Sequence, residues 1–158
     1  MGIKQIAVQR LSVTSSKSFG DIVAALDAAI GHPDMNLFRR DVNAAKTYAE
    51  LEDIVRKAVG SSDLMEFTRF DLGEILRKEH GTTAPRSLRL VAGNPLIMKQ
   101  MVEHLPDAGS YAPVTILIDE RPDGCICLMT EWPVSSLPTK VRKLCPWRGT
   151  WTQKSKPC

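Results

Sequence analysis

Three histidines, His32, His80 and His104, are the side chains in this sequence best suited to acid–base or metal chemistry. An imidazole exchanges a proton near neutral pH. An acid–base site would combine His104 with a nearby acidic or phenolic side chain, namely Asp107, Tyr111 or Asp119. Each histidine also has a simpler explanation, because His80 and His104 end predicted helices, where a positive charge suits the helix dipole, and His32 lies in a turn. No two histidines have the spacing of metal ligands, so we predict no metal site.

A second candidate is the turn formed by Gly93, Asn94 and Pro95 between a predicted strand and a predicted helix. Free backbone N–H groups at such a turn can hold an anion or a polar ligand. The alternative is a plain helix start, because Pro95 lacks an N–H and the loop contains no lysine or arginine. The glycine-rich loop that binds nucleotides is not present.

Apolar side chains supply a third candidate. They can either line a pocket for a small apolar ligand under a curved sheet or simply fill the core; they are Met65, Phe67, Phe70, Met98 and Met101. Across the three candidates, we predict no catalytic residue and no cofactor. The predicted ligand-binding residues are Phe70, Asn94, His104, Tyr111 and Asp119.

The composition places these residues in an ordinary globular protein. The chain has 158 residues, of which 43% are hydrophobic and 25% are charged. No apolar run approaches the roughly 20 residues that span a bilayer, and the first ten residues lack the apolar core of a secretory signal. We therefore expect a cytosolic protein without a membrane segment.

Local signals predict alternating strands and helices. Strands are expected at 6–15, with a bulge, and at 64–70, 87–92 and 112–120. Phe70 breaks the alternation of the second strand, so we expect both faces of that strand to be buried at its end. Helices are expected after Ser18, Thr47, Asp71 and Asn94, each of which can cap a first turn, and another is expected to start at His32-Pro33-Asp34 and to run to about Ala45. The two helices at about 33–60 look like an insertion beside the core. Asp123-Gly124 predicts a hairpin whose returning strand begins at 125.

These segments resemble a known family. Its characteristic stretches are SKSFGDIVAALDAAIG, LMEFTRFDLGEILRKEHG and SLRLVAGNPLIMKQMVEHLPDAGSYAPVTILIDERPDG, which cover nearly all of residues 12–124. The sequence is similar there to the family catalogued only as domain of unknown function 302 (DUF302). The resemblance implies an α+β domain with a curved antiparallel sheet backed by helices, likened to the TATA-box-binding protein. It also implies frequent dimers, and it implies no established activity.

The segment after Gly124 departs from that pattern. All four cysteines and all three tryptophans lie in these 34 residues, which carry six basic residues against one acidic residue, whereas residues 1–124 carry 15 against 17. Cysteine and tryptophan codons both begin with TG, so a one-base shift turns each of these positions into Leu, Met or Val, as a buried strand and helix require. We interpret the segment as a frameshift product. A single α+β domain is expected at 1–131, followed by an irregular basic tail at 132–158.

The cysteines suggest neither a zinc ribbon nor a disulfide framework. A basic tail with Trp147 and Trp151 could bind single-stranded nucleic acid, but the tail lacks an aromatic platform, so nucleic acid is an unlikely partner. The leading hypothesis is a homodimeric, non-enzymatic domain that binds a small apolar or polar ligand or a protein partner. The alternative is a small-molecule enzyme that uses the region of Asn94 and His104.

Overall fold

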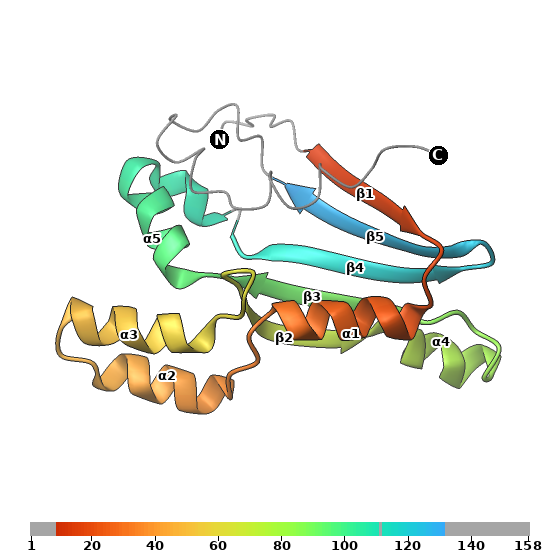
Figure 1. The fold of residues 1–158 in the computed structure, drawn as a ribbon, viewed down its shortest axis with the longest axis horizontal. Helices are drawn as coiled ribbons and strands as arrows, with labels where there is room; N and C mark the ends of the chain where they lie inside the picture. The colour runs from red at the N-terminus through yellow and green to blue at the C-terminus, as the bar shows by residue number, and fades with distance from the viewer. Residues whose placement is uncertain (1–8, 111, 132–158) are drawn as a thin grey trace, which may run out of the picture.

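Five strands form one antiparallel sheet in the computed structural model, which describes residues 9–110 and 112–131 (Figure 1). Their spatial order is β1-β5-β4-β3-β2, so the last strand lies inside the sheet and the first lies at an edge. The bounds are β1 Gln9–Ser15, β2 Met65–Asp71, β3 Ser87–Gly93, β4 Val114–Arg121 and β5 Gly124–Glu131.

Helices connect these strands and confirm the predicted α+β class. They are α1 Phe19–Ala29, α2 Met35–Ala44, α3 Tyr48–Ala58, α4 Leu72–His80, α5 Pro95–His104 and the short 3₁₀ helix η1 Pro106–Ser110. As predicted, α2 and α3 form a separate helical pair that projects beside the sheet (Figure 1). The sequence pattern did not predict η1. Within the described residues, no helix is both long and apolar enough to cross a bilayer.

Helix starts follow the predicted caps, and Asp34 adds a cap that was not predicted. In each case a side-chain oxygen accepts a hydrogen bond from a backbone N–H of the first turn; the capping residues are Ser18, Asp34, Thr47, Asp71 and Asn94. Pro95 occupies the first turn of α5, where its missing N–H does no harm. These caps fix where α1 and α4 begin, and both starts line the site described below.

The hydrophobic core lies between α1 and one face of the sheet. Alternate residues of the central strands point to this face, because side chains of a strand alternate between its two sides. The buried cluster comprises Leu26, Ile30, Leu64, Leu88, Leu90, Ala92, Ile116, Ile118 and Met129. Met65 is also fully buried, which agrees with the core-filling interpretation of that methionine.

Strand β2 carries a bulge that was not predicted, because its pairing with β3 shifts between Glu66 and Thr68. The bulge predicted for the strand at 6–15 does not occur within Gln9–Ser15, which pair with β5 in unbroken register, while residues 6–8 lie outside the described residues. The shift reverses the facing of later residues and explains why Phe70 breaks the alternation. The expected burial of both faces at the strand end is wrong, because Phe70 is 47% exposed.

The segment after Gly124 begins with the predicted hairpin partner. Gly124 adopts φ 137°, and β5 pairs with β4 on one side and β1 on the other. Cys125 and Cys127 point to the same face of this strand, and both are free thiols. The first residues of the anomalous segment are thus an integral part of the sheet. The tail expected at 132–158 lies outside the described residues.

Candidate functional site

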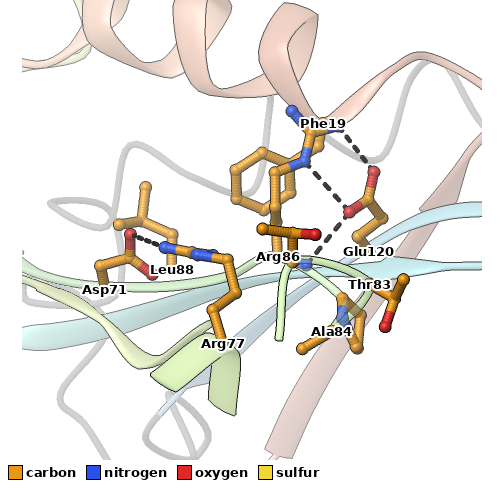
Figure 2. A pocket seen from close by; sticks show the side chains of 10 residues that line it. Phe19, Asp71, Arg77, Thr83, Ala84, Arg86, Leu88 and Glu120 are labelled. Atoms are coloured by element: carbon orange, nitrogen blue, oxygen red, sulfur yellow. Dashed lines mark hydrogen bonds and ion pairs between the residues drawn. The ribbon is translucent and has the colours of Figure 1, made fainter. Parts of the chain in front are cut away.

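A pocket of about 380 Å³ opens where the start of α1, the β2–α4 junction and the end of β4 meet (Figure 2). Two arginines and two carboxylates stand on its walls above an apolar floor. The lining residues are Phe19, Asp71, Arg77, Thr82, Thr83, Ala84, Pro85, Arg86, Leu88 and Glu120. We call this feature the arginine pocket.

Arg86 and Glu120 form the more extensive of the two ion pairs. Arg86 Nε donates to Glu120 Oε2 at 3.0 Å, and Arg86 Nη2 donates to Oε1 at 2.6 Å. The backbone N–H of Arg86 also donates to the Glu120 carboxylate at 3.1 Å, and the backbone N–H of Glu120 donates to the Arg86 carbonyl at 2.9 Å. Paired strands β3 and β4 bring these neighbouring positions together, because Ser87 lies opposite Asp119.

These bonds hold Glu120 in its ionised form. Hydrogen bonds from the Arg86 side chain and backbone lower the pKa of Glu120 from 4.5 to about 2. The stability gained from a depressed carboxyl pKa is present above its ordinary value and is lost as the pH falls through about 2. At neutral pH the arginine pocket therefore contains a fully formed guanidinium–carboxylate pair.

The floor of the pocket is apolar and carries the Arg86 guanidinium. The Arg86 Cζ lies 4.8 Å from the centre of the Phe19 ring, a cation–π distance. Phe19 is the first residue of α1, which Ser18 fixes by accepting a bond from the Asp21 N–H. Phe19 also packs against the buried cluster. The cap of α1 thereby sets the position of the aromatic floor.

Arg77 and Asp71 form the second pair. Arg77 Nη2 donates to Asp71 Oδ2 at 2.7 Å, while Asp71 Oδ1 accepts from the Glu74 N–H at 2.8 Å. Burial opposes ionisation of Asp71, but the bonds from Arg77 and the helix start outweigh it and keep the pKa below its ordinary value. Helix α4 then ends at Gly81, whose φ of 80° turns the chain into the Thr82–Arg86 loop.

The two pairs leave hydrogen-bonding capacity for a ligand. Within the described part of the chain, Arg77 uses only Nη2 in a side-chain hydrogen bond, although a guanidinium has five N–H donors. Thr82 and Thr83 add exposed hydroxyl groups at the rim. The two positive and two negative charges balance. The pocket therefore suits a small polar molecule with both donor and acceptor groups.

Comparison with known proteins decides the family. The pattern described as "Domain of unknown function DUF302" matches residues 39–143, which is more than half of the chain. The protein belongs to the DUF302 family. The match contains every residue that lines the arginine pocket except Phe19. It begins later than the expected residue 12, and it continues past Gly124, where we had expected the resemblance to end.

A solved member of the DUF302 family is also similar to this chain. The crystal structure of an uncharacterised conserved DUF302 protein from Bacillus stearothermophilus covers 86% of this chain and 86% of its own, with 8% sequence identity and a TM-score of 0.49. No curated protein sequence matches the chain significantly.

The DUF302 fold separates the residues that the sequence proposed as a ligand site. Asn94 and His104 lie at opposite ends of the ten-residue α5, about 15 Å apart at 1.5 Å per residue. Phe70 and Asp119 point to the sheet face opposite the core, and Tyr111 lies outside the described residues. Asp119 faces Arg121 at 3.5 Å.

Asn94 is occupied by structural bonds. Its Oδ1 accepts from the N–H groups of Leu96 at 2.9 Å and Ile97 at 3.4 Å, and its Nδ2 donates to the Asp63 carbonyl at 2.9 Å. This geometry favours the plain helix start over a polar-ligand site. Sequence reasoning missed the arginine pocket although it named Phe70 and Asp119, the immediate neighbours of two pocket residues. The facing of Asp71 and Glu120 toward α1 follows only from the strand register.

Proposed function

We propose that this DUF302 domain binds a small polar molecule in the arginine pocket and does not transform it. The observation that carries the proposal is the pair of guanidinium–carboxylate contacts above an apolar floor, in a volume typical of small-molecule sites. A charge-balanced pocket favours a zwitterionic or neutral polar ligand over a polyanion, because each sign of charge on the wall then meets its opposite.

The enzyme alternative rests on Asn94 and His104. Their positions at the two ends of α5 do not support a shared site, since acid–base partners must come within hydrogen-bond reach of one substrate. A catalytic role for His104 would need a partner other than Asn94. That Tyr111 or Asp119 is this partner stays a prediction.

We expect Arg86→Ala to weaken ligand binding. A screen of small zwitterionic and neutral polar molecules by thermal shift identifies a ligand for the unaltered protein. Loss of a charged hydrogen-bond donor then weakens its affinity by about tenfold or more. Arg40→Ala is the matched control, because Arg40 is exposed and paired with Asp41 on α2, away from the pocket. Equal affinity of the Arg86 and Arg40 variants for the ligand would place the site elsewhere.

We also propose that the domain forms a homodimer through α4 and the edge strand β2. The apolar side chains of α4 face outward at the i, i+3, i+4 spacing, since Leu72 and Leu76 are each 37% exposed and Ile75 is 68% exposed. Among the described strands β2 lies at the edge of the sheet, where only its start is bridged by Gly31, and Phe70 near its end is 47% exposed just before α4. A two-fold contact between identical edges would cover both stripes at once.

We expect Ile75→Glu to convert a dimer into a monomer in multi-angle light scattering. A buried, unpaired carboxylate at the centre of the stripe opposes association. Lys78→Ala is the control on the same helix, because Lys78 lies outside the stripe and pairs with Glu74. A monomeric mass for the unaltered protein, or a dimeric mass for Ile75→Glu, contradicts this interface. Sheet curvature like that of the TATA-box-binding protein and a cytosolic location also stay predictions.

A further inference from the structure

Four ionisable side chains meet at the C-terminal end of α1, away from the arginine pocket at its start: Asp27, His32, Glu66 and Arg69. His32 Nδ1 lies 3.4 Å from Glu66 Oε2, and His32 Nε2 lies 3.7 Å from Asp27 Oδ1. One ligand atom each from Asp27, His32 and Glu66 lie within 4.8 Å of one another.

The fold brings these residues together by two local devices. The Gly31 N–H donates to the Leu64 carbonyl and the Glu66 N–H donates to the Gly31 carbonyl, both at 2.8 Å, so the turn that carries His32 is fixed to the start of β2. The bulge after Glu66 supplies the second device. Residues three apart on a regular strand face opposite sides, but the extra residue lets Glu66 and Arg69 face the same side.

One hydrogen bond of His32 selects the tautomer of its neutral ring. Nε2 lies 3.1 Å from the backbone carbonyl oxygen of Asp27, which can only accept, so Nε2 carries the proton. In the neutral ring the lone pair of Nδ1 then faces the carboxylate oxygen of Glu66 at 3.4 Å. Two acceptors in this position repel unless a cation lies between them. An imidazole whose other N–H donates to a carbonyl is the usual arrangement of a metal-ligating histidine.

Arg69 already acts as a cation on the same carboxylates. Its Nη2 lies 2.5 Å from Asp27 Oδ1 and 2.7 Å from Glu66 Oε2. The hydrogen bonds that Arg69 donates to Glu66 and Asp27 raise the pKa of Arg69 above its ordinary value. The two oxygens that face His32 are thus the ones that hold the guanidinium, so a metal ion would compete with Arg69 for them.

We propose that Asp27, His32 and Glu66 form a binding site for a divalent transition-metal ion, with Arg69 as the competing counter-charge. One imidazole nitrogen and two carboxylate oxygens match the ligand preference of Zn²⁺ and Co²⁺. Ligand atoms about 2.1 Å from a tetrahedral ion lie roughly 3.4 Å apart, which matches the 3.4 Å between His32 Nδ1 and Glu66 Oε2, and the three ligand atoms all lie within 4.8 Å of one another. Asp27 and His32 are each 40% exposed, which leaves the fourth position open to water or a small ligand.

Titration with Co²⁺, followed by its visible absorption, tests the site in the full chain. We expect His32→Ala to weaken binding at least tenfold and Arg69→Met to strengthen it at least tenfold, because the competing cation is gone. His80→Ala is the matched control, since His80 is an exposed imidazole beside Glu79. We expect it to bind like the unaltered protein.

Equal affinity of the unaltered protein and His32→Ala overturns the proposal, and so does the absence of binding in both the unaltered protein and Arg69→Met. If neither protein binds the ion, the close contact between His32 and Glu66 is explained by a proton shared between the two side chains. Sulfur-to-cobalt absorption in the near ultraviolet would assign the metal to cysteines and likewise overturn it. If Arg69→Met does not fold, the His32→Ala comparison decides alone, because His32 is a partly exposed turn residue.

Discussion

Gly31→Ala is expected to destabilise the domain by more than about 3 kcal/mol, as severe overpacking does. A Cβ atom at Gly31 would lie 2.0 Å from the Ala58 carbonyl oxygen and 2.8 Å from the Gly60 nitrogen. Both obstacles are backbone atoms, so no side-chain rotation relieves the contact. The end of α1 can accommodate a methyl group only by moving away from the end of α3.

That movement would break the hydrogen bonds that join the helical insertion to the sheet. The N–H groups of Gly31 and Gly60 both donate to the Leu64 carbonyl at 2.8 Å, and the Ser62 N–H donates to the Ala29 carbonyl at 3.0 Å. Losing part of this network leaves backbone groups unpaired, which adds to the steric cost.

Urea unfolding of Gly31→Ala and Gly20→Ala measures the effect. Gly20 is the control because it lies at the start of α1, the helix that Gly31 follows, and its added Cβ would meet only Ser18 Oγ, at 3.9 Å. We expect Gly20→Ala to stabilise the helix by about 0.5–1 kcal/mol. If the free energies of unfolding of both variants lie within about 0.5 kcal/mol of the unaltered protein, the close packing of α1 against α3 is refuted.

Secondary structure was predictable because its signals are local. The Ser18 hydroxyl meets a backbone N–H three residues away, and the Asp123-Gly124 turn joins adjacent strands. A cap or a tight turn depends on residues that are neighbours in the sequence, so its position can be read without knowledge of the fold. The bulge of β2 left only an ambiguous trace, in the broken alternation at Phe70.

Neither the arginine pocket nor the cluster around His32 was predictable from spacing. Arg86 and Glu120 are 34 positions apart, and Arg69 and Asp27 are 42 positions apart. Such pairs form only once the strand register and the path of α1 are known, and a shift of one residue would turn each side chain to the other face of the sheet. Knowledge that Ser87 lies opposite Asp119 would have placed Arg86 beside Glu120.

Ile118→Ala is expected to cost about 2–5 kcal/mol of the free energy of unfolding. Ile118 is fully buried on β4, the middle strand of the sheet, between Leu88 of β3 and Cys127 of β5. Three methyl-sized groups are removed from a place where the neighbouring strands are fixed by ladders on both sides. The cavity therefore cannot close by backbone movement, and the cost includes lost contacts as well as lost burial.

The matched control for this cavity is Ile75→Ala in α4. The same atoms are removed there from a side chain that is 68% exposed in the single chain, so we expect a change within about 0.5 kcal/mol at a protein concentration too low for the proposed dimer to form. Urea unfolding should give unchanged m-values for both variants, because neither alters the surface exposed on unfolding by much. Equal losses for Ile118 and Ile75 would mean that β4 is not the centre of the core. In that case a rigid central strand could not be the reason why Glu120 of β4 and Asp71 of β2 keep their positions in the arginine pocket.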